Sequence, residues 1–338
     1  MTPMKSAALL VLALSAAGAH AADGQVINLY SSRHYQTDPA LYENFTKQTG
    51  ITVNRIEAGE NEVIERIVKE GATSPADVLV TVDISRMARA DAQGLFAPVS
   101  SPVLNERIPA HLRTDDWMAF SVRSRVIVHN ASVKAAWVQN YEDLANPRLK
   151  GKLCVRNGSH PYNLSLGATV LQHNGEKKTE QWAKGIVANL ARPPKGGDLD
   201  QVRGVASGDC GVAITNSYYL GRLMRSDKPE DKKVIESISI VFPNQKGYGA
   251  HVNVSGAGVL KHAPNRENAI RFLEYLASDE AQVYFADGNN EWPAAPTAKS
   301  PNPALAQLGS FKADKTNVGD IAKHLATVQQ IYEAAGWK

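Results

Sequence analysis

The chain has 338 residues, of which 21% are charged, and its formal net charge is only +3. A length of this order favours two domains of ordinary size. The charged residues are well mixed and form no dense Lys/Arg block with interleaved aromatic side chains, which argues against nucleic-acid binding. The sequence has one long apolar run, near the N-terminus, and no second one. We therefore expect no stable membrane insertion of the mature chain.

The first 21 residues have the three parts of an export signal. Lys5 gives a basic start, residues 7–14 are apolar, and Ala19-His20-Ala21 is typical of a cleavage site. The apolar run is shorter than the roughly 20 residues that a membrane-spanning helix needs. We expect residues 1–21 to be a signal peptide that is cleaved after about Ala21; an uncleaved N-terminal anchor is the alternative.

The next part of the chain alternates predicted strands and helices. Strands are predicted at 25–30, 51–56 and 77–82, and helices at 39–49, 62–69 and 84–93. Asp38 is the expected N-cap, with a proline at the first helical position, and the second helix is expected to bury Val63, Ile64, Ile67 and Val68 on one face. This βαβαβα order favours an α/β fold with a mainly parallel sheet flanked by helices.

The rest of the chain continues the alternation. Strands are predicted at 120–129, 151–156, 211–215 and 252–259, and helices at 163–172, 218–224, 266–276 and 321–335. No repeat or low-complexity linker separates the halves, which favours two lobes joined by more than one chain crossing. We predict an N-terminal lobe of residues 22–121 plus about 250–298, and a C-terminal lobe of residues 122–249 plus about 299–338.

Two cysteines, Cys154 and Cys210, are present. In an exported protein the expected state is one disulfide, and two buried free thiols are the alternative. The spacing is unlike that of a zinc site, because the cysteines are far apart and no C-x-x-C motif occurs.

Tyrosines stand at three predicted strand-to-helix junctions. Tyr35 precedes the first helix, Tyr162 precedes the helix predicted at 163, and Tyr218 and Tyr219 follow the strand that ends at 215. Ligands of open α/β sheets bind beyond the carboxyl ends of the strands, which is where such junctions lie. The sequence therefore predicts a cluster of phenols at a binding cleft.

A phenol is normally neutral, with a pKa near 10. Metals deprotonate their ligands, hard cations prefer oxygen donors, and ferric iron is known to accept tyrosine. Any one of these tyrosines alone is more typical of simple packing. Together they indicate a small ligand or a cation, without deciding which.

Six segments resemble those of the periplasmic ferric-iron-binding proteins of ABC importers, bacterial relatives of transferrin. The matching segments are Tyr30–Tyr35, Val122–Val126, Asp143–Pro147 leading to Gly151–Leu153, Pro161–Asn163, Asn216–Tyr219 and His251–Ala257. They extend over almost the whole mature chain. The segments at 216–219 and 251–257 are the most specific, whereas the one at 143–147 is shared with other binding proteins.

The resemblance implies a type II periplasmic binding protein fold and five iron ligands: His34, Tyr35, Tyr162, Tyr218 and Tyr219. It is closest to the tyrosine-rich subgroup, which can dispense with a synergistic anion, so carbonate is an optional part of the site. Arg33 and Arg123 are the expected anion partners or supports of the ligands, since a guanidinium offsets phenolate charge; ordinary salt bridges are the alternative.

The resemblance also implies what the protein does. It would capture Fe(III) as a periplasmic monomer and deliver it to an inner-membrane ABC permease. An alternative is the same fold binding a polyamine, a phosphonate or sulfate. An enzyme is disfavoured, because neither a G-x-S-x-G nor an H-E-x-x-H motif occurs.

Overall fold

The computed structural model describes residues 25–33 and 37–338. The predicted signal peptide and two predicted ligands, His34 and Tyr35, lie outside these residues. The strands are β1 (Val26–Ser31), β2 (Thr52–Glu57), β3 (Val78–Val82), β4 (Met118–His129), β5 (Leu153–Cys154), β6 (Val212–Asn216), β7 (Ser239–Val241), β8 (Val252–Val259) and β9 (Trp292–Pro293).

The helices alternate with these strands. They are α1 (Asp38–Thr49), α2 (Glu60–Glu70), α3 (Ile84–Ala92), α4 (Pro102–Arg107), α5 (Pro161–Asn174), α6 (Glu176–Ala188), α7 (Asp198–Ser207), α8 (Ser217–Met224), α9 (Pro229–Glu236), α10 (Arg266–Leu276), α11 (Asp279–Asp287), α12 (Pro303–Leu308), α13 (Val318–Ala322) and α14 (Leu325–Ala335). Short 3₁₀ turns lie at Gly71–Thr73, Ala110–Leu112, Ala135–Trp137, Glu142–Ala145 and Pro147–Leu149.

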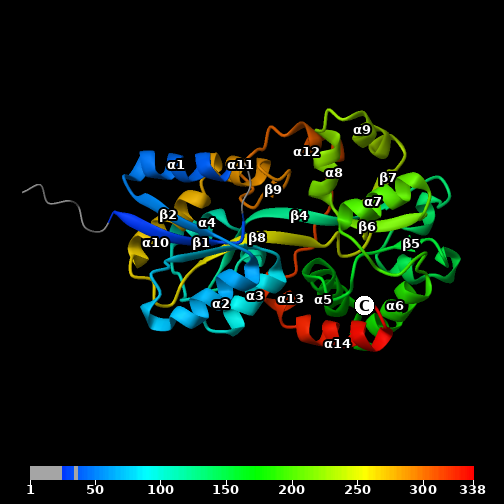
Figure 1. Ribbon diagram of the computed structural model, residues 1–338, viewed down its shortest axis with the longest axis horizontal. Helices are drawn as coiled ribbons and strands as arrows, with labels where there is room; N and C mark the ends of the chain where they lie inside the picture. The colour runs from blue at the N-terminus through cyan, green and yellow to red at the C-terminus, as the bar shows by residue number, and fades with distance from the viewer. Residues whose placement is uncertain (1–24, 34–36) are drawn as a thin grey trace, which may run out of the picture.

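One long strand joins two groups of strands. The main path of the sheet is β2-β1-β3-β8-β4-β6-β5, with β7 and β9 also paired to β4. The first half of β4 pairs with β8 and its second half, from Arg125 onward, pairs with β6. In Figure 1, β4 and β8 run through the middle of the molecule, between β1–β3 on one side and β5–β7 on the other.

The α/β fold is confirmed, but the sheet is mixed rather than mainly parallel. The pairs β1–β2, β1–β3 and β5–β6 are parallel, whereas every pairing of β4 and β8 is antiparallel. β3 is buried along its whole length, which agrees with its mainly apolar sequence, and β8 is equally buried although it contains Asn253 and Ser255.

The helices cover each group of strands separately. α1, α2, α3, α10 and α11 surround the first group, and α5, α6, α7, α8 and α9 surround the second (Figure 1). The last segment of the chain returns to the second group, because α12 contacts α8 and α14 packs on α5 and α6. The boundaries of the two lobes themselves stay a prediction.

Three local expectations differ from the structure. Asp38 is the first residue of α1 rather than its N-cap, because its carboxylate is buried against Arg33. Val68 leaves the buried face of α2 and is 49% exposed. The helix predicted at 321–335 is divided into α13 and α14, since the chain turns at Lys323 and His324.

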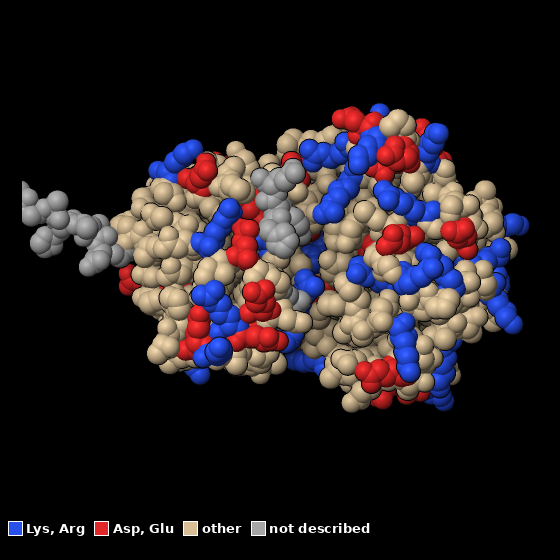
Figure 2. All heavy atoms as spheres, viewed as in Figure 1, with Lys and Arg blue, Asp and Glu red and all other residues tan. Residues whose placement is uncertain are grey.

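The surface carries both signs of charge. Figure 2 shows Lys and Arg interspersed with Asp and Glu over the face seen in Figure 1, in keeping with the small net charge. Within residues 25–33 and 37–338, no helix combines the length and the apolar character needed to cross a bilayer.

The predicted disulfide is confirmed. Cys154, at the end of β5, is bonded to Cys210, just before β6, and both residues are buried. β5 and β6 are parallel neighbours. The bond therefore ties together the two segments that lead into α5 and α8.

We expect the double substitution Cys154→Ala/Cys210→Ala to lower the free energy of unfolding by about 4 kcal/mol, because the bond closes a loop between residues 56 apart in sequence. Urea denaturation of the two proteins at equal pH measures the difference. Equal midpoints for the variant and the wild type would contradict this expectation.

Candidate metal centre

Three of the predicted tyrosines come together from two helix starts. Tyr162 is the second residue of α5, and Tyr218 and Tyr219 lie in the first turn of α8. The hydroxyl oxygens of Tyr162 and Tyr218 are 3.0 Å apart. The rings of Tyr218 and Tyr219 lie 4.2 Å apart, centre to centre. The described part of the chain thus contributes three phenols to one cluster.

The start of α5 is fixed by a histidine. His160 is the N-cap, Pro161 occupies the first turn, and the His160 Nδ1 atom accepts a hydrogen bond from the backbone N–H of Tyr162. Burial, together with the charges of Arg156 and Arg125, lowers the pKa of His160 to about 3. The imidazole is therefore neutral near pH 7 and can accept this bond, which sets the direction of Tyr162.

The start of α8 is held against the central strand. β6 ends at Asn216, and the next side chain, Ser217, accepts a hydrogen bond through Oγ from the backbone N–H of Ser124 on β4 at 3.1 Å. Because Tyr218 and Tyr219 come next, the helical turn brings both rings to the same end of the sheet.

Arginines surround the phenols. The guanidinium carbons of Arg123, Arg125 and Arg156 lie 5.9, 5.8 and 5.2 Å from the ring centre of Tyr162. Arg222 lies 5.5 Å from the ring centres of both Tyr218 and Tyr219. Positive charge at this range favours the ionised form of a phenol.

The phenol of Tyr162 nevertheless has a raised pKa. Burial is the main cause, and the nearby Tyr219 and Asp83 add to it, while Arg123 and the hydrogen bond with Tyr218 act in the opposite direction. Tyr162 is 8% exposed and Tyr218 is 4% exposed. The hydroxyl of Tyr162 is thus protonated near neutral pH, and a cation that binds it has to displace the proton.

A groove lies beside this cluster. It has a volume of about 650 Å³ and is lined by α3, by the first turn of α5 and by residues 322–329 of α13 and α14, with Arg86, Arg89 and His160 among its residues. The ring of His160 packs edge-on against that of Tyr162, with their centres 4.5 Å apart. The groove thus borders the tyrosine cluster through the ring of His160.

Asp83 joins the elements around the cluster. Its carboxylate accepts hydrogen bonds from Ser85 on α3, from Ser165 Oγ on α5 at 2.6 Å and from Asn253 Nδ2 on β8 at 2.6 Å. Its backbone φ of +90° is unusual for a residue other than glycine. Burial raises the pKa of Asp83, but Arg123 and the hydrogen bonds of Ser165 and Ser85 outweigh it, and the pKa is lowered.

The two predicted arginines lie in different surroundings. Arg123 donates to Ser255 Oγ at 3.0 Å and lies 3.8 Å from Glu291, so it is buried next to the tyrosine cluster. Arg33 is buried beside Asp38, and its guanidinium lies 3.6 Å from the ring centre of Phe285. Their role towards an anion stays a prediction.

Sequence reasoning missed four groups of this site: Asp83, Arg125, Arg156 and Arg222. Two of these residues, Arg125 and Arg222, carried a signal in their spacing along the sequence. Arg125 follows Arg123 by two residues on a strand and so shares its face, and Arg222 follows Tyr218 by four residues on a helix. Arg156 and Asp83 carried none, because their position depends on packing between segments far apart in sequence.

The described residues contain no group of three His, Cys, Asp or Glu side chains that could hold a metal ion. The oxygen atoms gathered at this site are those of phenols instead.

Comparison with known proteins decides the family. The family model described as "Bacterial extracellular solute-binding protein" matches residues 40–333. The chain belongs to this family. It is 47% identical to Iron uptake protein A1 of Synechocystis sp., over 93% of this chain and 88% of the relative, and 49% identical to Iron uptake protein A2 of the same organism, over 94% and 91%.

Among solved structures, this solute-binding protein is similar to Trichodesmium IdiA (FutA) in complex with iron and citrate ligands. The identity is 50%, the TM-score is 0.90, and the match covers 93% of this chain and 100% of the other. This chain and that structure therefore share one architecture over almost their whole length, and the predicted type II fold is confirmed.

We expect Asp83→Asn to be less stable than the wild type at pH 7 by about 1–3 kcal/mol, because an amide nitrogen would face groups that donate hydrogen bonds. The lowered pKa means that the carboxylate contributes its full stability above 3.8, its ordinary value, and loses it as the pH falls further. Urea denaturation at several pH values should show the two proteins converging below pH 3.8. A gap that stays constant down to pH 2 would contradict this assignment.

Proposed function

We propose that this protein captures ferric iron through the phenolates of Tyr162, Tyr218 and Tyr219 and delivers it to an inner-membrane ABC permease. The observation that supports this most is the convergence of three phenols, two of them with hydroxyls 3.0 Å apart, in a chain whose relatives are iron uptake proteins. Ferric iron is hard and highly charged, so it can ionise phenols and hold them together.

The donor set extends to residues outside the described part. The resemblance in sequence supports His34 and Tyr35 as further ligands from the N-terminal lobe, and Arg123 as a group that offsets phenolate charge. Four phenolates leave a net charge of −1 on Fe(III), which the surrounding guanidiniums can balance. Carbonate remains an optional companion of the metal.

The proposed mechanism is binding with closure. The two lobes, at the boundaries given by the sequence analysis, would rotate about the crossing strands β4 and β8, and iron held by both lobes would favour the closed form. The permease would recognise that form. In this proposal the protein is a periplasmic monomer, exported with cleavage after about Ala21, and it carries out no chemical turnover.

We expect purified mature protein to gain a visible absorption band when Fe(III) is added, saturating at one iron per chain. In Tyr219→Phe the band weakens or shifts, because one phenolate is lost. The measurement is a spectrophotometric titration after stripping with a chelator.

Tyr275→Phe is the matched control, since this tyrosine lies on α10 and its hydroxyl donates to the carbonyl of Leu41. It should titrate like the wild type. A colourless protein that ignores iron would remove the proposal and favour an organic or oxyanion solute on the same fold.

We also expect the apparent affinity for Fe(III) to fall as the pH is lowered. Because the raised pKa keeps Tyr162 protonated, binding releases its proton, and each phenol ionised steepens the dependence by about ten-fold per pH unit. Competition titrations against a chelator of known pH dependence, between pH 5 and 8, measure the slope. An affinity independent of pH would exclude phenolate ligands.

A further inference from the structure

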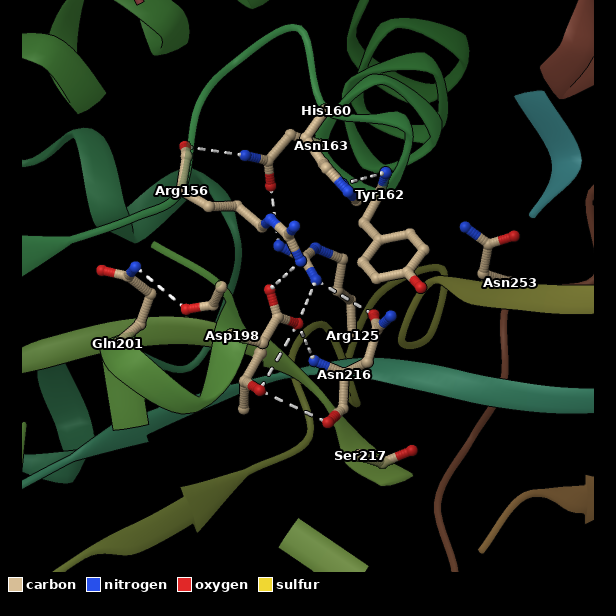
Figure 3. A network of polar contacts seen from close by, with 12 residues as sticks. Arg125, Arg156, His160, Tyr162, Asn163, Asp198, Gln201, Asn216, Ser217 and Asn253 are labelled. Atoms are coloured by element: carbon tan, nitrogen blue, oxygen red, sulfur yellow. Dashed lines mark hydrogen bonds and ion pairs between the residues drawn. The ribbon is translucent and has the colours of Figure 1, made fainter. Parts of the chain in front are cut away.

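A buried polar network lies directly behind the tyrosines. Arg125, on β4, donates through Nη1 to Asp198 Oδ2 at 2.9 Å and to Asn216 Oδ1 at 3.0 Å, and through Nη2 to Asn163 Oδ1 at 2.7 Å. Arg156 donates to the other carboxylate oxygen of Asp198 at 3.1 Å. Figure 3 shows these groups meeting, with the ring of Tyr162 beside them.

The network holds the two segments that carry the phenols. Asn163 is the neighbour of Tyr162, and its amide also donates to the carbonyls of Arg156 and Asn157. Asn216 precedes Tyr218 by two residues, and its backbone N–H donates to Asp198 at 2.7 Å. One guanidinium thus fixes the start of α5 relative to the start of α8, although Asn163 and Asn216 are 53 positions apart in the sequence (216 − 163).

The network also carries net positive charge. Two guanidiniums face one carboxylate, since Arg125 and Arg156 both pair with Asp198. Arg125 and Asp198 are fully buried and the side chain of Arg156 is 14% exposed, so water screens this charge weakly. The surplus positive charge lies within 6 Å of the ring of Tyr162.

Stability alone gives a weak reason for such a network. Buried ion pairs are often no better than apolar residues of similar volume, because desolvation offsets their attraction. A preorganised binding site needs directional bonds at defined places, and apolar packing does not supply them as well as hydrogen bonds do. The hydrogen bonds to Asn163 and Asn216 have this directional character.

We propose that Arg125, Asp198 and Asn163 are positioning residues that set the spacing of the three phenols, and that Arg156 supplies positive charge which favours their binding to a trivalent cation. This inference rests on the proposed function. It adds residues that lie behind the phenols and hold the segments that carry them.

Asn163→Ala tests the positioning role, because it removes the link from Arg125 to α5 and leaves the Arg125–Asp198 pair in place. We expect Fe(III) to bind about ten-fold more weakly, the loss typical of a hydrogen bond to a charged group, and the iron band to shift. The matched control is Asn189→Ala, a buried amide that likewise donates to two backbone carbonyls, those of Leu144 and Asn146. It should lose stability but keep both the affinity and the band.

Substitutions at Arg156 test the charge, and they apply even if Asn163→Ala does not fold. Arg156→Gln should weaken Fe(III) binding by about ten-fold, and Arg156→Lys, which retains the charge, should restore most of it. Chelator competition and the iron spectrum are recorded for every protein.

The outcomes separate this inference from the proposed function. If the wild type binds no iron, the proposed function fails. If the wild type binds iron and both Asn163→Ala and Arg156→Gln match it in affinity and spectrum, the positioning network is wrong while the function stands. If Asn189→Ala weakens binding as much as Asn163→Ala, the effect is general destabilisation and the inference is also overturned.

Discussion

The long strand β4 pairs with strands of both groups, and this shared strand fixes how the two groups are joined. Because its first half pairs with β8 and its second half with β6, this strand belongs to both groups of strands. Alternate residues of a strand share a face, so Arg123 and Arg125 project to the same side. Both guanidiniums lie within 6 Å of the ring of Tyr162. The crossing strand thus links the arrangement of the lobes to the electrostatics of the site.

Burial and the nearby positive charge shift the pKa of Tyr162 in opposite directions. Burial keeps the phenol of Tyr162 protonated, while the arginines around it favour the phenolate. Without a metal, such a phenol stays neutral. When a highly charged cation binds, the phenol loses its proton and becomes a strong ligand. The buried carboxylates of Asp83 and Asp198 hold neighbouring helices and arginines in place through several hydrogen bonds each. Rigid support of this kind suits a protein that must bind one small ion selectively.

Local patterns were enough to predict much of this molecule. The strands β1–β3, β4 and β8 and the helix α10 follow from apolar periodicity. The disulfide follows from two cysteines in a chain predicted to be exported. The tyrosines could be chosen because each follows a strand and opens a helix. Features that depend on contacts between distant segments could not be predicted from the sequence. These are the antiparallel pairing of β8 with β3 and the exposure of Val68. The ion pairs of Arg125 and Arg156 with Asp198 are a further example. Asp83 is an example, because nothing in the local sequence indicates its positive φ.

We propose that the hydroxyl oxygens of Tyr162, Tyr218 and Tyr219 bind the metal directly. Anomalous diffraction at the iron absorption edge, from crystals of the iron-loaded protein, tests it most directly. We expect one strong peak within coordination distance of all three hydroxyl oxygens. A peak elsewhere on the protein, or iron bound with these three oxygens still hydrogen-bonded only to each other and to solvent, would contradict it.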